Sequence, residues 1–300
     1  MFSTLRTWAE FVKFAHTIFA LPFALAAMVV AARHFDSPGW PGWRIFGLIL
    51  AAMVCARTCA MAFNRIVDRK FDAQNPRAAT RALPAGRISL ASAWTLCAGS
   101  ALGLVVASYF LNPLCFYLSP LALAIVCFYS LTKRFTDYTH VFLGLALALA
   151  PMGGWLAVRG TALTWLEMIT MSLLAVAVVL WLVGFDIIYA LQDCEFDRKH
   201  GLHSLVVGWG SKNALDAAFL SHLLMWLLLA AFGLLCRFRL AYLAGLLLIL
   251  GSLLLEHWLA RRRSLKWIHV SFFRMNALIS LVFLLATVAE VVFRGGFKIR

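Results

Sequence analysis

Charged residues are scarce in this chain of 300 residues. Only 13% of the residues are charged, 63% are hydrophobic, and the mean hydropathy is +0.87. A water-soluble domain of this size has too little interior to bury so much apolar surface. Runs of about 20 apolar residues are long enough to cross a bilayer as helices, and the alternation expected of a β-barrel is absent. The sequence therefore predicts an all-α, polytopic membrane protein.

The chain also lacks any CxxC pair, although it contains seven cysteines. Nearly all of these lie inside apolar runs, which disfavours a disulfide framework. Cys55 and Cys59 stand four residues apart, and two apolar-facing thiols favour packing over metal ligation. His16, His140 and His222 have no pairing at metal-ligand spacing, so we expect them to occupy core or interface positions.

Nine apolar stretches are candidate membrane spans, and together they predict a single integral-membrane domain over residues 1–300. They cover residues 14–32, 44–64, 89–109, 113–131, 140–157, 164–190, 213–235, 240–258 and 272–293. Most connections are short, and the longer ones are residues 65–88, 191–212 and 259–271.

Basic residues outnumber acidic ones, 27 to 13, for a net charge of +14. A nucleic-acid partner is disfavoured because, apart from Arg57 and Arg274, the basic residues lie between the spans. Membrane topology and anionic lipid headgroups account for that distribution. The side that includes the N-terminus holds 17 Lys and Arg residues and the other side holds 8. The positive-inside rule therefore predicts a cytoplasmic N-terminus and an external C-terminus.

A short internal repeat links two of the polar loops. "DRKFD" at Asp68–Asp72 recurs as "DCEFD" at Asp193–Asp197. The copies lie four spans apart, so they have the same orientation in the membrane. This predicts two four-helix halves related by an axis along the membrane normal.

The first acidic motif shares a helix face with a deeper arginine. At 100° per residue, Arg57, Asn64, Asp68 and Asp72 fall within a narrow arc at the cytoplasmic end of the second span. An unpaired charge within a span costs at least about 2.5 kcal/mol. The position of Arg57 within a span therefore favours a role in a functional site over structural pairing with a neighbour.

The second motif has the same character. On a continuous helix, Asp186, Tyr189, Asp193 and Asp197 form one polar stripe at a cytoplasmic span end. Four carboxylates converging from two helices repel one another without a counterion. Oxygen-only ligands suit Mg²⁺, which completes its coordination with water and phosphate.

Basic residues surround the acids. They are Arg65, Arg69, Lys70, Arg77, Arg81, Arg198 and Lys199. A single DxxxD motif at a helix end is usually a solvated face, but two copies with polar residues deeper in the span favour function. Metal ions, basic groups and a membrane setting indicate a substrate with a diphosphate head and a hydrophobic tail.

At these residues the sequence resembles the UbiA-type intramembrane aromatic prenyltransferases. The family's NxxxDxxxD motif matches Asn64, Asp68 and Asp72, and its second DxxxD matches Asp193 and Asp197. The segments "NPRAATRALPAGRIS", "YALQDCEFDRKHGLHS" and "FYSLTKRFTDYTH" also match. The chain looks most like the 4-hydroxybenzoate polyprenyltransferase branch. "AMAFNRIVDRKFDAQNPR" further resembles a subgroup linked to menaquinone made through futalosine, whose acceptor is a dihydroxynaphthoic acid.

The resemblance implies nine spans around a central cavity and a role in ubiquinone or menaquinone biosynthesis. Two Mg²⁺ ions, held by the four aspartates and Asn64, would bind the diphosphate of a polyprenyl diphosphate, and the acceptor would be an aromatic hydroxy acid. Candidates for the outer diphosphate oxygens are Arg77, Arg81, Lys133, Arg134 and Lys199.

Further roles follow as hypotheses. Tyr189 or Tyr129 would stabilise the allylic cation through its ring face. Arg57 would pair with the acceptor carboxylate. Asp186 or Asp193 would accept the ring proton. Residues 73–86 would form a basic cap that can close over the diphosphate.

One alternative from another functional class remains open beside a UbiA-type enzyme with another acceptor. A transporter would use Arg57, Asp186 and Glu256 to line an ion path. A CDP-alcohol phosphotransferase also clusters aspartates, but its DG…AR…G pattern is not found in this chain. Neither the prenyl chain length nor the acceptor follows from the sequence.

Overall fold

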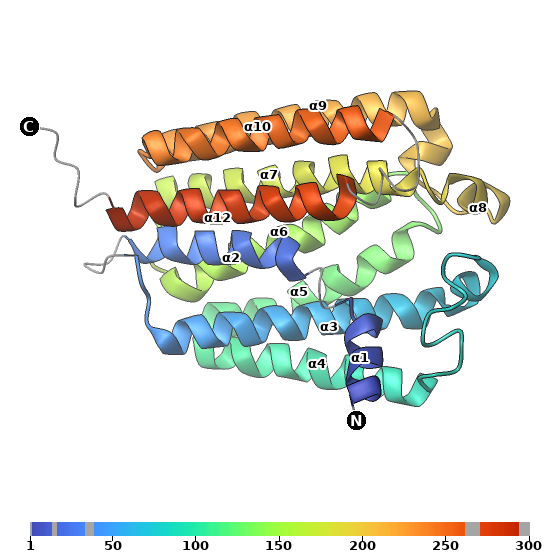
Figure 1. Cartoon of the computed structure of the whole chain (residues 1–300). Helices are drawn as coiled ribbons and strands as arrows, with labels where there is room; N and C mark the ends of the chain where they lie inside the picture. The colour runs from blue at the N-terminus through green and yellow to red at the C-terminus, as the bar shows by residue number, and fades with distance from the viewer. Residues whose placement is uncertain (1, 14–16, 34–38, 262–270, 294–300) are drawn as a thin grey trace, which may run out of the picture.

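The computed structural model describes residues 2–13, 17–33, 39–261 and 271–293, and every regular element within these ranges is helical (Figure 1). The elements are α1 (Phe2–Phe11), α2 (Thr17–Ala32), α3 (Trp43–Gln74), α4 (Leu90–Leu111), α5 (Pro113–Thr132), α6 (Thr139–Arg159), α7 (Trp165–Ala190), α8 (Cys194–Lys199), α9 (Leu205–Leu235), α10 (Leu240–Arg261), the π-helical turn η2 (Ser271–Met275) and α12 (Asn276–Val292). The predicted all-α class is confirmed.

Eight helices within the described residues are long and apolar enough to cross a membrane. A multi-pass membrane protein is therefore confirmed, but the predicted count of nine is not. The first predicted span, residues 14–32, corresponds to the shorter apolar helix Phe19–Ala32, and its first residues and His16 lie outside the described ranges. The pseudo-repeat of two halves and the single-domain assignment stay predictions.

Two helices extend well beyond their predicted spans. Helix α3 continues to Gln74, as the shared face of the first acidic motif indicated. Helix α9 begins at Leu205, eight residues before the predicted start at residue 213. Its backbone breaks at Gly210, where φ is 78°. That left-handed conformation suits glycine, and the predicted span matches the straight part of the helix after the break. The short helix α1 was not predicted at all.

Side-chain caps fix where several helices begin. The hydroxyl of Ser89 caps α4, Ser204 caps α9, and the side-chain oxygen of Asn112 caps α5. Thr164 and Glu167 form a reciprocal capping box on α7. Each cap satisfies amide groups that the first helical turn leaves unpaired. The helices can therefore follow one another through short, well-defined turns.

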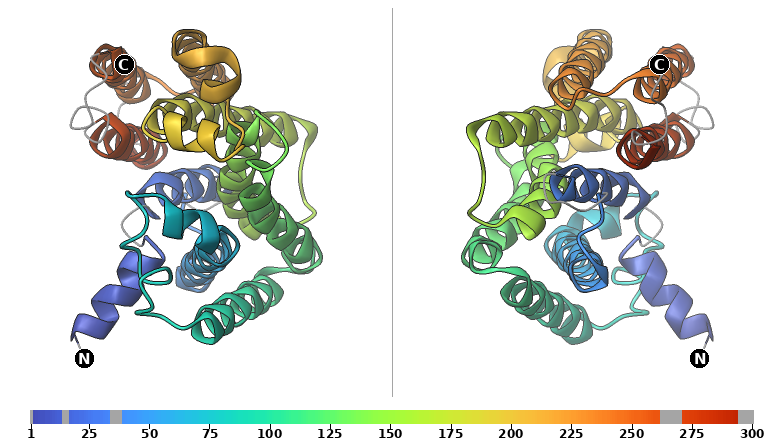
Figure 2. Two further views of the ribbon diagram at one scale, coloured as in Figure 1. Left: turned by 90° about the vertical axis from the view of Figure 1, so that its right-hand side faces the viewer. Right: turned by 90° about the vertical axis from the view of Figure 1, so that its left-hand side faces the viewer.

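The apolar core has one large part and smaller clusters beside it. The larger part joins α2, α6, α7, α9, α10 and α12 around aromatic side chains, with Phe23 against both Phe283 and Trp181. A smaller cluster joins α1, α3 and α4. Seen along the helices, α2 lies inside the bundle and α4 and α5 lie at its edge (Figure 2). Gly154 allows α6 to approach α2 closely, because any side chain there would clash with the Ala24 carbonyl.

The polar connections gather at one end of this bundle. The segment after α3, the turn between α5 and α6, and α8 all lie at the right-hand end of Figure 1. The two acidic motifs therefore share one end of the molecule, as their common orientation predicted.

Candidate active site

The first acidic motif lies on the last turns of a continuous helix. Asn64, Asp68 and Asp72 all belong to α3, which ends at Gln74. The Asn64 amide donates to Asp68 Oδ2 at 2.9 Å. The helix therefore presents these three side chains along one face, in agreement with the prediction.

The second motif is built differently, and the predicted single polar stripe is wrong. Helix α7 ends at Ala190, so Asp186 and Tyr189 belong to the membrane helix. Asp193 lies in the following turn, and Asp197 belongs to the six-residue helix α8. Aspartate competes with the helical backbone for hydrogen bonds and favours turns and helix starts. The backbone therefore turns before Asp193 instead of continuing α7.

Both aspartates of the first motif pair with basic side chains. Arg134, from the turn after α5, donates to Asp68 Oδ1 at 3.1 Å. Arg81, from the segment after α3, donates to Asp72 Oδ1 at 2.6 Å. Arg65 lies 3.7 Å from the other oxygen of Asp72. The carboxylate charges on α3 are thus balanced by groups from two loops.

The second motif is balanced in the same way. Arg77 bonds Asp193 Oδ1, and its other terminal nitrogen donates to the Tyr189 hydroxyl at 3.1 Å. Lys133 donates to Asp197 Oδ2 at 3.2 Å. The segment after α3 and the turn after α5 therefore each contact both motifs.

The electrostatics of Lys133 reflect this acidic setting. Burial disfavours its charged form, but the negative charges of Asp197, Asp193 and Asp186 outweigh that effect and raise the pKa of Lys133. Burial raises the pKa of Asp197, and the Lys133 charge only partly opposes the shift. Three carboxylates thus act on one ammonium group at this end of the bundle.

Arg57 lies two turns before Asn64 on α3. Its Nε atom is buried and has no hydrogen-bond partner within the described residues. Tyr129 of α5 interacts with it electrostatically. A buried guanidinium nitrogen without an acceptor is costly, so this position favours an anionic ligand.

Asp186 and His140 form a pair that the sequence did not indicate. Asp186 Oδ2 lies 2.6 Å from His140 Nδ1, and the histidine side chain is fully buried at the start of α6. The expected core position of His140 is confirmed, but its contact with a predicted site residue was missed. The one available signal was its place in the "FYSLTKRFTDYTH" segment.

Two more polar residues beside the second motif escaped the sequence analysis. Asn75 Nδ2 lies 3.5 Å from Asp193 Oδ1. Gln192 has both amide atoms buried without a hydrogen-bond partner in the described part of the chain. Conversely, Lys199 is exposed on α8 and makes no ion pair with any described residue, so the structure does not bring it to the carboxylates.

The candidate metal ligands have the chemistry of a magnesium site but not its geometry. All the candidate ligands offer oxygen, and Asp72 Oδ2 is buried without a hydrogen-bond donor. Such a set fits an oxygen-preferring divalent cation. Across the described ranges, however, no three Asp, Glu, His or Cys side chains converge closely enough to hold a metal ion. Each of the four carboxylates is instead paired with a basic side chain, and these pairs would have to open when a cation binds.

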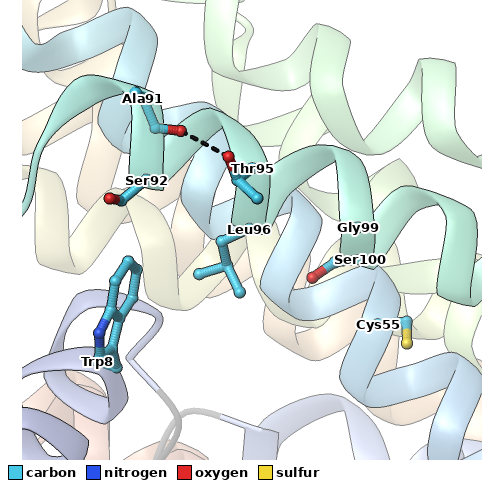
Figure 3. A pocket seen from close by; sticks show the side chains of 8 residues that line it. All are labelled: Trp8, Cys55, Ala91, Ser92, Thr95, Leu96, Gly99 and Ser100. Atoms are coloured by element: carbon cyan, nitrogen blue, oxygen red, sulfur yellow. Dashed lines mark hydrogen bonds between the residues drawn. The ribbon is translucent and has the colours of Figure 1, made fainter.

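A surface groove of about 650 Å³ lies away from the predicted site residues. It runs between α1, α3 and α4 and is lined by Trp8, Cys55 and small α4 side chains such as Ser92, Gly99 and Ser100 (Figure 3). None of the predicted site residues lines it, so the acidic motifs and this groove are separate features.

A helical membrane bundle with two acidic motifs at one end defines a class of intramembrane enzymes, and comparison with known proteins identifies it. The model of the UbiA prenyltransferase family matches residues 20–278. The chain belongs to the UbiA prenyltransferase family and is an enzyme, a prenyltransferase, as its resemblance predicted.

Relatives support this assignment. The chain is 32% identical over 229 residues to the 4-hydroxybenzoate octaprenyltransferase of Tolumonas auensis, covering 76% of this chain and 77% of that one. The enzyme of the same name from Alcanivorax borkumensis is 33% identical over 234 residues, with the same coverage.

Solved structures agree on the fold. An apo UbiA homologue from Aeropyrum pernix K1 has a TM-score of 0.81 and 32% identity, covering 90% of this chain and 96% of that one. A UbiA homologue from Archaeoglobus fulgidus bound to GPP and Mg²⁺ has a TM-score of 0.71 at 20% identity, covering 95% and 99%. At that identity the second likeness shows the fold alone.

Proposed function

We propose that this enzyme transfers a polyprenyl group from a polyprenyl diphosphate to an aromatic hydroxy acid, in a reaction that requires Mg²⁺. The acceptor is 4-hydroxybenzoate or a dihydroxynaphthoic acid, for ubiquinone or menaquinone synthesis. The observation that carries the proposal is the meeting of four ion-paired aspartates from both motifs at one end of a membrane bundle. The names of the relatives and the GPP and Mg²⁺ bound to the Archaeoglobus homologue support it.

The acidic side chains would hold the cation. Asn64, Asp68, Asp72, Asp193 and Asp197 are the candidate ligands. When bound, Mg²⁺ neutralises charge that grows on the leaving diphosphate. If these carboxylates held the cation, Arg77, Arg81, Lys133 and Arg134 would be free to bind the outer diphosphate oxygens. The ion pairs of the structure thus keep the cationic groups close to where the diphosphate binds.

The acceptor would lie deeper, toward Arg57. The carboxylate of an aromatic acid would supply the hydrogen-bond acceptor that Arg57 Nε lacks. Tyr129 interacts electrostatically with Arg57, so its ring would lie on the acceptor side of the site, where it could stabilise an allylic cation. The Tyr189 ring lies 5.4 Å from the Arg77 guanidinium and is already engaged by that charge.

The ion-path alternative has less support. Glu256 accepts a hydrogen bond from Asn276 at 2.9 Å and lies beside His222, in contacts that join α9, α10 and α12. Asp186 pairs with His140 of α6 instead. The three charges proposed for an ion path thus have separate surroundings.

Orientation follows from charge. The excess of Lys and Arg on one side supports a cytoplasmic location for the N-terminus and the acidic motifs. In a bacterium this corresponds to the inner membrane.

The test is direct. Membranes containing the protein are incubated with labelled polyprenyl diphosphate and, separately, 4-hydroxybenzoate and each dihydroxynaphthoic acid, with Mg²⁺ or with EDTA. Labelled prenylated product should form with one acceptor class and only when Mg²⁺ is present. Absence of product with every acceptor, or full activity in EDTA, would overturn the proposal.

A further inference from the structure

The Asp186–His140 pair lies outside the set of side chains proposed to hold the diphosphate. Asp186 lies four residues before the end of α7, and His140 lies in the first turn of α6. Asp186 has no Lys or Arg within ion-pair distance in the described residues, whereas Asp193 is bound by Arg77. Of the two aspartates considered as proton acceptors, Asp186 is therefore the one not already paired with an arginine or lysine.

The hydrogen-bond pattern assigns the proton of the pair. His140 Nε2 is buried and has no partner among the described residues. A proton on Nε2 would leave a buried N–H group without an acceptor, which is costly. A proton on Nδ1 is accepted by Asp186 Oδ2 at 2.6 Å. In this tautomer His140 is the hydrogen-bond donor to Asp186.

The remaining oxygen of Asp186 is the reactive position. The Asp186 side chain is 20% exposed, whereas that of His140 is fully buried. No hydrogen bond occupies Asp186 Oδ1 within the described ranges. The histidine cannot reach a substrate from this position, so any effect that it has on the reaction passes through the aspartate.

We propose that Asp186 is the catalytic base that removes the ring proton of the aromatic acceptor, and that His140 is a positioning residue that fixes its carboxylate. This inference rests on the proposed function. The prenyl C–O bond breaks with its electron pair going to the diphosphate, and a ring carbon forms the new C–C bond. The electron pair of the C–H bond at that carbon then restores the aromatic ring, and the proton passes to Asp186 Oδ1.

The test uses an acceptor deuterated at the ring positions beside its hydroxyl. In the wild type, proton loss follows C–C bond formation quickly, so the isotope effect on kcat should be close to unity. Asp186→Asn should lower kcat by about 10² or more, the usual contribution of a general base. It should also produce a normal primary isotope effect while the KM for prenyl diphosphate stays near the wild-type value. Near-normal kcat without an isotope effect would overturn the inference.

Variants of His140 separate positioning from packing. His140→Asn keeps an N–H donor near the place of Nδ1 and should retain most of the wild-type kcat. His140→Leu removes the donor, so it should lose kcat and acquire the isotope effect. If that variant does not fold, His140→Gln, whose amide lies nearer the place of Nε2, takes its place. Equal kinetics for the Asn variant and the donor-lacking variant would contradict a positioning role.

His222→Leu is the matched control. His222 is also fully buried, and it is hydrogen-bonded to His257 at 2.9 Å and to the Trp181 carbonyl at 3.0 Å. Its loss should lower the melting temperature without creating an isotope effect. If His140→Leu behaves in the same way, the role of His140 is structural only and the inference fails. Wild-type enzyme that transfers no prenyl group would overturn the proposed function itself, which distinguishes the two failures.

Discussion

The two acidic motifs have the same DxxxD spacing but different backbones. Asp68 and Asp72 lie on α3, a helix of 32 residues that continues without interruption from the membrane. Asp193 and Asp197 lie on a turn and on α8, a helix of only six residues. A helix this short is not stable by itself. The first motif is therefore positioned by its own helix, and the second depends on contacts with other segments.

The contacts that hold the second motif come from the turn after α5. Lys133 pairs with Asp197, and the Lys133 carbonyl accepts a hydrogen bond from the His203 amide at 2.7 Å. His203 Nδ1 also lies 3.0 Å from Asp137 Oδ1. These contacts thus connect the turn after α5, residues 133–137, to residues 197–203. We expect the two motifs to respond differently when these contacts are removed.

The largest expected effect tests what the motifs share. Asp68→Ala and Asp193→Ala should each reduce Mg²⁺-dependent prenyl transfer by at least about 10²-fold, because each removes a proposed ligand of the cation that would neutralise the leaving diphosphate. The motifs should differ in hydrogen exchange. Asp193→Ala frees Arg77 and should speed exchange in residues 75–88, whereas Asp68→Ala should not, since its loop partner is Arg134. Near-normal activity in both variants would refute the shared role.

The sequence predicted the first motif better than the second for a physical reason. Helical periodicity placed Asn64, Asp68 and Asp72 on one face correctly, because α3 does continue through them. The same projection failed for Asp193, since a local turn preference overrides periodicity within a few residues. The ion pairs were beyond reach as well. Except for the two pairs that Asp72 makes with Arg65 and Arg81, the partners are more than 60 residues apart, as with Lys133 and Asp197, and no local pattern encodes such contacts.

Separation along the sequence also explains why the contact of His140 was missed. Its partner Asp186 is 46 residues away on another helix, and only the packing of α6 against α7 brings them together. Spacing rules detect ligands that one helix presents. They do not detect a pair formed between two helices. The family resemblance identified the segment that contains His140 but assigned it no role.

A smaller effect is expected from Lys133→Met, which breaks the ion pair of the second motif. Partly exposed ion pairs contribute roughly 0.2–1 kcal/mol, so exchange in residues 191–204 should increase by up to about fivefold. Arg134→Met is the matched control. It removes the partner of Asp68 but should leave exchange within α3 unchanged, because that helix does not depend on the pair. Equal increases in hydrogen exchange at both motifs would contradict the inference that only the second motif depends on contacts with other segments.

The smallest expected effect concerns His203→Ala. This change removes the bond to Asp137 but keeps the His203 backbone amide that binds the Lys133 carbonyl. Because both side chains are partly exposed, the loss should be at most about 1 kcal/mol. Prenyl transfer should fall less than about fivefold. The fall should come from a higher KM for the prenyl diphosphate more than from a lower kcat. Asp137→Asn should give a similar result, and combining the two changes should add little, since each removes the same contact. A double variant whose losses multiply would show that His203 and Asp137 support the second motif independently.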